Sequence, residues 1–355
     1  MPKRTIPRIM HLAEQLEADI RRRGLQSGDA YMNAAEVAGF LRISASTANR
    51  VLQILDRRGI VERAQKKGTF ISNPDQEQPL HTIERIHMVT FQDSVKQSGL
   101  MTEPVIVGIQ NSLPGSMIQF NFLPPLGNRD HLRRLLDEAQ RSPDPVGVVL
   151  TRAPYHAQKM VEASGIPGVI HGYPQPTVTK LAWISIDYNA IGKLCADFVM
   201  RKKAKELIQL LPERPLLPGD YRLQRSVRHA LAAAGYDSAA FRVCTLPVDE
   251  EAVHGWLREE IDGRKSRPIV ICSPEFLTAS PSDALKRLGL KRTQYEVLVI
   301  DDHRMAVDTL PRISSPISDF EVGVHIAELL QRQVRGETDS LHEIFPVELI
   351  PEGAT

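Results

Sequence analysis

The pattern that most constrains this chain is a run of short amphipathic segments between Asn33 and Ile71. Asn33 can accept hydrogen bonds from the first turn of a helix, and Glu36 stands three residues later, where its side chain can reach back to the cap. We therefore predict a helix over residues 34–41. A second helix is predicted to begin at Ser44, with core-facing positions at Ala48, Val51, Leu52 and Leu55 and with Gly59 at its end.

The other face of the second helix carries short or polar side chains, as a surface that meets base edges in the major groove requires. After it, residues 60–63 and 69–71 are predicted to form a hairpin whose tip carries Lys66 and Lys67. Helix, turn, helix and basic hairpin predict a winged helix-turn-helix (α+β) that binds double-stranded DNA. Gln53 also lies on the outward face of the helix. The residues predicted to contact DNA are Ser44, Ser46, Thr47, Asn49, Arg50, Lys66, Lys67 and Thr69.

The charge distribution fits this prediction better than the total charge does. The whole chain has a net charge of only +1, but residues 1–72 contain 13 Lys and Arg against 7 Asp and Glu, which gives +6 and leaves 1 − 6 = −5 for the rest. A basic N-terminal region on an acidic body favours local phosphate contact while the body is repelled from DNA.

A further helix is predicted before the motif, over residues 7–23, and a polar linker after it, over residues 73–82. Arg21, Arg22 and Arg23 end that helix, where positive charge favours the negative pole of the helix dipole and also suits phosphate contact. The linker contains two prolines and lacks apolar periodicity. The predicted DNA-binding domain is therefore residues 1–72.

The run RRRGLQSGDAYMNAAEVAGFLRISASTANRVLQILDRRGIVERAQKKGTFI resembles the GntR-type winged-helix domain. That family has a Gly-x-Leu-x-x-Gly approach, a recognition helix that begins at Ser, a Leu-x-x-x-Gly exit and a Gly-Thr-Phe wing. Family members usually carry arginines in the columns of Ala35, Ala45 and Asn49, so the resemblance implies no particular operator sequence. Arg50 is our candidate for one base contact, with a solvated helix face as the alternative.

From residue 83 the pattern changes to short apolar strands that alternate with helices. The predicted strands cover residues 86–91, 118–122, 147–150, 168–170, 183–186, 206–210, 242–246, 268–271 and 296–300, and helices are predicted at 130–141, 190–202, 225–234, 250–261 and 281–288. Such alternation is typical of parallel sheets covered on both faces. A body of about 270 residues is too long for one such sheet, so we predict two lobes, the first from 83–187 and 316–336 and the second from 188–315 and 337–352.

Two segments of this body resemble LacI/GalR-type regulators, which share their fold with periplasmic sugar-binding proteins. They are WISIDYNAIGKLCADFVMRKK and EVLVIDDHRMAVDTLPRISSPISDFEVGVHIAELLQRQVRGE, and the order continues to a terminal strand at 342–350. The resemblance implies a two-lobed α/β effector-binding domain of the periplasmic-binding-protein type over residues 83–355. It also implies a small polar effector, such as a sugar, between the lobes.

In the resembled family, an Asp from a late strand and an Arg at the start of a second-lobe helix grip the ligand. Asp301 occupies the Asp position beside Asp302, whereas Leu223 occupies the Arg column. Arg222 and Arg225 flank that column, and each also suits a surface role. Asp187 is a second carboxylate candidate, with capping of the next helix as its alternative. The predicted effector contacts are Asp301, Asp187, Arg222, Arg225, Ser273 and Phe91, with Tyr188, Tyr221 and Phe276 as further rings that could stack or lie in the core.

Other classes of site have little support in the sequence. Cys195, Cys244 and Cys272 are far apart and are expected to be buried free thiols, and no phosphate loop, nucleophile elbow or metal-ligand spacing is present. We therefore predict neither a cofactor nor a metal, and no enzyme activity. A signal peptide and a membrane-spanning stretch are not expected either, so we predict a cytoplasmic protein.

The sequence thus predicts a ligand-responsive transcriptional regulator, a repressor that binds an operator as a homodimer. Two other hypotheses remain open at this point. One is a small-solute sensor or binding protein that does not act on DNA, and the other is a metabolite enzyme with a regulatory domain at its N-terminus.

Overall fold

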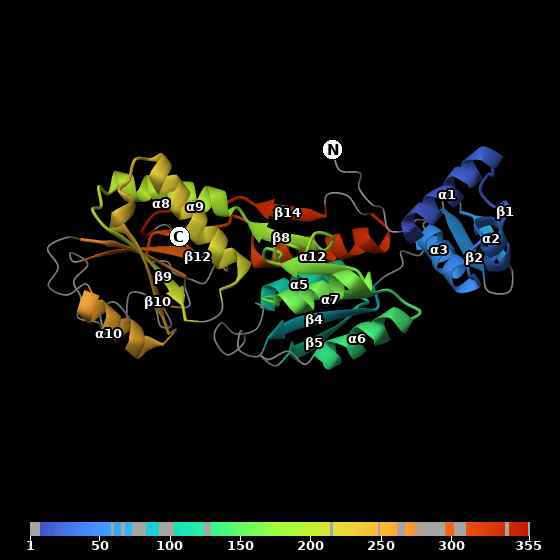
Figure 1. Ribbon diagram of the computed structural model, residues 1–355, viewed down its shortest axis with the longest axis horizontal. Coiled ribbons are helices and arrows are strands. Elements are labelled where there is room, and N and C mark those ends of the chain that lie inside the picture. The colour runs from blue at the N-terminus through green and yellow to red at the C-terminus, as the bar shows by residue number, and fades with distance from the viewer. Residues whose placement is uncertain are drawn as a thin grey trace.

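The computed structural model has three blocks in a row (Figure 1), an N-terminal domain at one end and two α/β lobes beyond it. It describes residues 8–57, 60–64, 68–72, 83–91, 103–123, 129–213, 216–247, 249–260, 267–273, 276, 295–301, 310–337 and 341–353. The predicted linker and the wing lysines Lys66 and Lys67 therefore lie outside the described residues, as does the helix predicted at 281–288.

The N-terminal domain packs three helices against a small antiparallel sheet. Its elements are α1 (Arg8–Arg23), β1 (Ala30–Tyr31), α2 (Ala34–Leu41), α3 (Ala45–Arg57), β2 (Val61–Ala64) and β3 (Gly68–Ile71), with strand order β1-β3-β2. The core positions predicted for α3, namely Ala48, Val51, Leu52 and Leu55, are all fully buried, and they meet Leu16 of α1 in one cluster. The predicted winged helix-turn-helix is confirmed.

The first lobe, which begins at residue 83, holds a parallel six-stranded sheet with the order β14-β8-β7-β6-β4-β5. Its elements are β4 (Arg85–Phe91), α5 (Glu103–Ser112), β5 (Met117–Leu123), α6 (Arg129–Arg141), β6 (Val146–Thr151), α7 (Tyr155–Ser164), β7 (Gly168–His171), β8 (Ala182–Ile186), α12 (Asp319–Val334) and β14 (His342–Phe345).

The second lobe holds another six-stranded sheet, with the order β10-β9-β11-β12-β13-β15. Its elements are α8 (Tyr188–Arg201), β9 (Leu207–Pro212), α9 (Pro218–Ala233), the 3-10 helix η1 (Ser238–Ala240), β10 (Phe241–Leu246), α10 (Glu250–Glu260), β11 (Ile269–Cys272), β12 (Glu296–Asp301), β13 (Arg312–Ser314) and β15 (Glu348–Ile350). All pairs are parallel except β13–β15.

Each sheet is buried on both faces, which explains why its strands are apolar at successive positions. In β6, Val148 and Leu150 join the cluster under α6 and α7, whereas Val149 between them joins the cluster under α5 and α12. Successive side chains of a strand point to opposite faces of the sheet. When helices cover both faces, every side chain is buried and is therefore apolar. The predicted mixed fold class, with parallel sheets in the two-lobed body, is confirmed.

The chain passes between the lobes three times, at β8–α8, at β13–α12 and at β14–β15. The last passage differs from our prediction of one terminal strand, wholly in the second lobe. Residues 342–345 pair with β8 of the first lobe, and only residues 348–350 pair with β13 of the second. Because β8 and β13 both lead directly into the other lobe, the carboxyl ends of the two parallel sheets face one another. We call these the facing edges.

Most predicted elements of the body are present within one to three residues of the expected bounds, but α9 begins seven residues earlier than predicted. Pro218 suits the first turn of that helix, and the Leu217 amide donates to Asp220 Oδ2 at 2.7 Å. Helices α5 and α7 and strands β1 and β13 were not predicted.

Helices pack very closely in both lobes at glycines. A Cβ at Gly323 of α12 would lie 2.1 Å from the Val105 carbonyl oxygen of α5, and one at Gly108 of α5 would lie 2.1 Å from the Phe320 carbonyl oxygen. In the second lobe, a Cβ at Gly192 of α8 would lie 2.4 Å from Ser226 Oγ of α9. Both helix pairs therefore need a residue without a side chain at the crossing.

No helix in the described part of the chain is long and apolar enough to cross a membrane. Cys195 and Cys272 are buried and Cys244 is half-buried, and none of the three forms a disulfide. Burial raises the pKa of the Cys195 thiol well above its usual range.

Candidate functional site

The helix-turn-helix is set up by the cap at Asn33. Asn33 Oδ1 accepts hydrogen bonds from the amides of Ala35 and Glu36 at 2.9 and 3.1 Å, and the Asn33 amide donates to Glu36 Oε2 at 2.7 Å. The predicted capping box is thus present. Arg42 then adopts a left-handed conformation with φ 52°, and it ends α2 directly before the turn into α3.

The start of α3 is held by side chains predicted to contact DNA. Ser44 Oγ accepts from the Thr47 amide at 3.2 Å and lies 2.8 Å from Thr47 Oγ1. Ser44 and Asn49 are exposed and Thr47 is half-buried. Ser46 and Arg50 lie in α3, but their side chains are outside the described part of the structure. Polar groups of this helix, at Ser44 and Asn49, are thus exposed on the surface of the domain.

The wing itself presents a different environment for Thr69. Its side chain is only 4% exposed, on β3, the central strand, which pairs with both β1 and β2. We expected a DNA contact at Thr69, and its burial instead gives the residue a role inside the wing. Glu62 of β2 is exposed.

A buried carboxylate orders the end of α1, and the sequence did not reveal it. Asp19 is 2% exposed; it forms ion pairs with Arg22 and with Arg23, the latter at 2.8 Å, and it accepts from the Tyr31 hydroxyl at 3.2 Å. Burial raises the pKa of Tyr31, and the nearby Asp19 raises it further. Arg22 and Arg23 thus have an intramolecular partner in Asp19, and the Arg22 side chain is still 72% exposed.

In the body, the predicted acidic residues have separate environments. Asp301 ends β12 at the facing edge; it is 1% exposed and lies opposite the equally buried Ser314 in the register of β12 and β13. Asp187 caps α8, because its Oδ1 accepts from the Asn189 and Ala190 amides at 2.9 and 3.0 Å. The capping alternative for Asp187 is therefore the one observed.

One contact between the lobes at this edge is made by Tyr173. Tyr173 follows β7 in the first lobe, and the Arg222 guanidinium of α9 lies 3.9 Å from the centre of its ring. Its ring also lies 5.6 Å from Tyr188 of α8 and 4.7 Å from Trp183 of β8, in tilted arrangements. Burial raises the pKa of Tyr173, Arg222 opposes that shift, and Asp187 adds to it. We call Tyr173, Tyr188, Trp183 and Arg222 the interlobe cluster.

Gly219 makes room for this cluster. A Cβ at Gly219, in the first turn of α9, would lie 2.5 Å from the Tyr188 hydroxyl. The ring of Tyr188 is therefore held between Tyr173 and the start of α9. Cation–π contacts of this kind contribute about 0.5–2 kcal/mol, more as they lose water.

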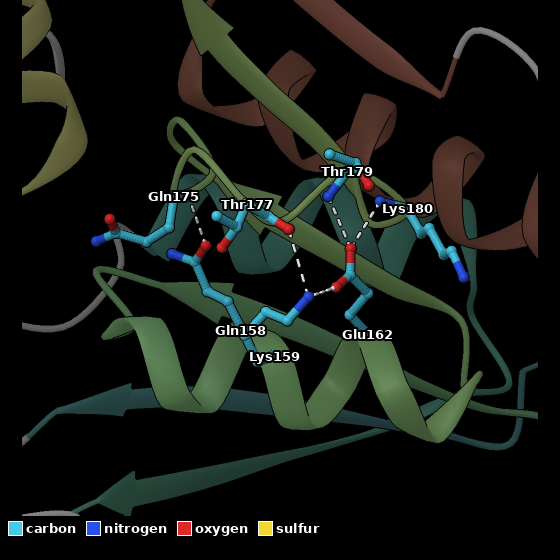
Figure 2. Close-up of polar contacts among 7 residues, drawn as sticks. All are labelled: Gln158, Lys159, Glu162, Gln175, Thr177, Thr179 and Lys180. Atoms are coloured by element: carbon cyan, nitrogen blue, oxygen red, sulfur yellow. Dashed lines mark hydrogen bonds and ion pairs between the residues drawn. The ribbon is translucent and has the colours of Figure 1, made fainter. Parts of the chain in front are cut away.

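The loop that carries Tyr173 is tied to α7 (Figure 2). Glu162 Oε1 accepts from the amides of Thr179 and Lys180 at 2.7 and 2.8 Å, and Glu162 Oε2 forms an ion pair with Lys159. The Lys159 ammonium also donates to the Thr177 carbonyl oxygen at 3.3 Å. Burial opposes the charge on Glu162, yet hydrogen bonds from Lys159 and from the two amides lower the pKa of its carboxyl.

A second tie lies closer to Tyr173. Gln158 is 2% exposed; its Oε1 accepts from the Gln175 amide at 2.9 Å and its Nε2 donates to the Ala153 carbonyl oxygen at 2.9 Å (Figure 2). Together with the Glu162 contacts, these side-chain bonds hold the loop that carries Tyr173 against α7.

The remaining predicted effector residues are spread over both lobes. Arg225 is exposed on α9, whereas Leu223 packs on the second-lobe core. Ser273 directly follows β11 and is half-buried. Phe91 ends β4, with its side chain outside the described part. Two of the further aromatic candidates are not in the interlobe cluster: Phe276 is a residue of the second-lobe core, and Tyr221 is 58% exposed. Asp302 lies outside the described residues.

Two residues at the facing edge were missed by the sequence reasoning. Thr151 ends β6, and its Oγ1 is buried with no hydrogen-bond partner among the described residues. Arg152 follows with φ 49°, a left-handed conformation that is uncommon for a residue other than glycine. Such conformations are frequent at ligand sites. The strand order reverses between β4 and β6, and ligands of open α/β sheets bind beyond the carboxyl ends of the strands at such a reversal.

Comparisons with known proteins agree with this architecture. Residues 8–71 match the family model of the bacterial regulatory proteins, gntR family. No curated protein matches the chain by sequence. Among solved structures, a complex of the transcriptional regulator CelR with cellobiose has a TM-score of 0.60 at 16% identity and covers 92% of this chain and 100% of that one.

Two further structures cover a smaller share of this chain. The transcription regulator CcpA of Lactococcus lactis has a TM-score of 0.58 at 12% identity and covers 77% of this chain and 99% of that one. A LacI family transcriptional regulator from Enterococcus faecium with bound ribose has a TM-score of 0.59 at 15% identity, with 77% and 98% covered. At these identities the likeness establishes the shared fold.

Proposed function

We propose that this chain, in which a gntR-type winged helix is joined to a body with the fold of LacI family regulators, is a cytoplasmic transcriptional repressor controlled by a small polar effector. The observation that carries the proposal is the combination of exposed polar residues on α3, whose first turn is held by Ser44, with a contact between the lobes at their facing edges. One feature provides a DNA-binding surface, and the other provides a place where a ligand can change the arrangement of the lobes.

In the proposed complex, α3 enters the major groove and the wing lies along the phosphates. Asn49 is exposed on α3, and Arg50 follows it in the sequence, so both are assigned to base edges. Lys66 and Lys67 are assigned to phosphate oxygens, which they attract without reading sequence. The charge of +6 on residues 1–72 supports this assignment.

The proposed active form is a homodimer. Twofold symmetry presents two recognition helices to half-sites separated by one or more helical turns, ~34 Å each. Strand β5 lies at the edge of its sheet, and Met117 and Phe122 on it are 62% and 41% exposed, as is Val107 of neighbouring α5 at 48%. These exposed apolar side chains support pairing with a second copy through this edge.

The effector is proposed to bind at the facing edges, next to the interlobe cluster. Aromatic rings can stack on the apolar face of a sugar ring, and the Arg222 guanidinium and the Asp301 carboxylate can hold its polar groups. Two of the similar structures contain cellobiose and ribose, so we propose a sugar or a sugar derivative. A ligand that takes the place of the Tyr173–Arg222 contact would release one lobe from the other.

Release of that contact changes DNA affinity only if the dimer geometry that fits the operator prefers one arrangement of the lobes. The coupling between two such sites is typically about 1–3 kcal/mol. The direction is proposed to be that of an inducer, in which the effector lowers operator affinity.

The DNA part of the proposal is tested by fluorescence anisotropy with operator and unrelated duplexes at several salt concentrations. Changing both Lys66 and Lys67 to alanine is expected to weaken binding to all sequences. The negative slope of log K against log salt is expected to become less steep, by up to ~2. Asn49→Ala is expected to relax base preference at one position in each half-site. Absence of duplex binding at low salt would favour a solute sensor that does not act on DNA.

The effector part is tested by thermal shift with ribose, cellobiose and phosphorylated sugars. A ligand that binds the folded state raises the melting temperature with the logarithm of its excess. Arg222→Ala is expected to abolish the response, whereas Arg225→Ala on the same helix is expected to retain it and serves as the matched control. A response that is lost only in Arg225→Ala would assign the ligand contact to Arg225 in place of Arg222. Chemical turnover of the ligand would favour the enzyme hypothesis.

A further inference from the structure

A histidine and two glutamates come together on the first lobe, in α12 and β14, apart from the interlobe cluster. His325 and Glu328 lie one turn apart on α12, and Glu343 lies in β14. The Nδ1 atom of His325 is 2.7 Å from Glu343 Oε2 and 3.7 Å from Glu328 Oε2. One ligand atom of each residue lies within 4.8 Å of the other two.

These distances suit a divalent transition-metal ion. Protein ligands lie about 2.0–2.2 Å from Zn²⁺, which places neighbouring ligand atoms of a tetrahedral site about 3.4 Å apart. The observed 2.7 and 3.7 Å lie on either side of that separation. An imidazole nitrogen and carboxylate oxygens are ligands that Zn²⁺ and its neighbours accept. The side chains are partly exposed, at 35%, 55% and 25% for His325, Glu328 and Glu343, which leaves room for solvent as a further ligand.

The imidazole is already oriented toward the two carboxylates. Its ring packs edge-on against Phe345, with centroids 5.2 Å apart and an interplanar angle of 61°, and Phe345 is buried. The Nδ1 atom itself is buried and makes no hydrogen bond of acceptable geometry within the described residues, although a carboxylate oxygen lies 2.7 Å away. A bare Nδ1 lone pair would repel a carboxylate at that distance, so either an Nδ1 proton or a bound cation must lie between them. The lack of acceptable hydrogen-bond geometry at Nδ1 favours the cation.

We propose that His325, Glu328 and Glu343 form a binding site for a divalent transition-metal ion of the Zn²⁺ type. The position of the site gives the ion a structural consequence. Helix α12 directly follows the β13–α12 passage between the lobes, and β14 directly precedes the β14–β15 passage (Figure 1). An ion held here ties together the two elements that flank two of the three passages, so it stiffens the hinge from the first-lobe side.

The site is tested on untagged full-length protein that has been treated with a chelator and then desalted. Isothermal titration with Zn²⁺ is expected to give one ion per chain, and Co²⁺ is expected to give visible absorption bands from a low-symmetry nitrogen–oxygen site. His325→Ala and Glu343→Gln are each expected to weaken Zn²⁺ binding at least ~10-fold, since loss of even an indirect ligand contact costs that much. Glu328→Gln, at a more exposed position, provides a variant that keeps the packing if His325→Ala fails to fold.

The matched controls are His229→Ala, an exposed histidine on α9, and Glu348→Gln, an exposed glutamate on β15. Both are expected to bind Zn²⁺ as the unmodified protein does. Zn²⁺ binding that survives His325→Ala, Glu328→Gln and Glu343→Gln would overturn the assignment. So would the absence of any Co²⁺ spectrum or Zn²⁺ heat, which would leave an ordinary contact between the histidine and the two carboxylates, with no ion. Neither result bears on DNA or sugar binding.

Discussion

The two lobes have the same strand order and differ in how the last strand is added. If the strands of each lobe are numbered 1 to 6 along the chain, their order across both sheets is 2-1-3-4-5-6. Strand 6 is parallel to strand 5 in the first lobe and antiparallel to it in the second. Strands β8 and β13 both run toward the facing edges. A chain that leaves the first lobe beside β8 in the same direction must therefore enter the second lobe against the direction of β13.

The lobes also differ in how they support the contact between them. Tyr173 stands on a loop, which needs ties to Glu162 and Gln158 to keep its position. Arg222 stands on a helix, where the backbone hydrogen bonds of α9 provide the support. One side of the proposed effector site is thus adjustable through a few side chains, and the other is fixed by secondary structure.

The largest expected effect concerns the first-lobe helix crossing. Gly323→Ala places a Cβ against a backbone oxygen and a backbone nitrogen of α5, at 2.1 and 2.9 Å, and neither can move without the helix. We expect a loss of about 3 kcal/mol or more in the free energy of unfolding of that lobe. Urea denaturation followed by circular dichroism measures it. An unchanged midpoint would mean that α12 can shift away from α5 at no cost.

The second-lobe crossing is expected to be more tolerant. In Gly192→Ala the Cβ meets Ser226, at 2.4 Å from its hydroxyl oxygen and 2.6 Å from its backbone, so part of the clash can be relieved by a side-chain rotation. We expect a loss of about 1–3 kcal/mol. Gly255→Ala is the control, because nothing lies within 4 Å of its Cβ on α10 and alanine favours a helix. Equal losses at Gly192 and Gly323 would remove the distinction between the lobes.

The loop support is tested by Glu162→Gln, which removes the charge that holds two amides and Lys159. Hydrogen exchange at the Thr179 and Lys180 amides is expected to become about tenfold faster, which corresponds to about 1.4 kcal/mol. Lys180→Ala is the control, since only the amide of Lys180 contacts Glu162. Exchange that is equally fast in both variants would show that the carboxylate does not hold the loop.

The smallest expected effect is a pH dependence specific to the first lobe. Burial in β4, with Arg85 nearby, lowers the pKa of His87 to about 4. The unfolded chain then binds the proton more strongly than the folded lobe, so stability is full above the unfolded pKa of about 6.5 and falls as the pH drops toward 4. The loss is expected to be on the order of 1–2 kcal/mol after allowance for partial solvation. His87→Gln, measured by denaturation at pH 7 and pH 5, is expected to reduce this dependence.

The DNA-binding domain and the strands of the body could be predicted from sequence because their determinants are local. The Asn33–Glu36 cap joins two residues three positions apart. Strand β6 is recognisable in the sequence from its run of consecutive apolar residues. The interlobe cluster could not be predicted, since Tyr173 and Arg222 are distant in sequence and meet only when both lobes are folded. The resemblance led to Arg222 and Arg225 equally, and the stacking on Tyr173 is what separates them. His325 and Glu343 were missed for the same reason.

The split of residues 342–350 between the two sheets has a consequence for biosynthesis. The winged helix draws on residues 8–72 alone and can assemble early, while the ribosome is still translating the body. Neither lobe can complete its sheet until this short segment emerges, because one half of it closes β8 and the other half closes β13. A premature stop before residue 342 would therefore turn β8 and β13, which are interior strands in the complete protein, into edge strands in both sheets at once. Newly exposed edge strands are prone to aggregate.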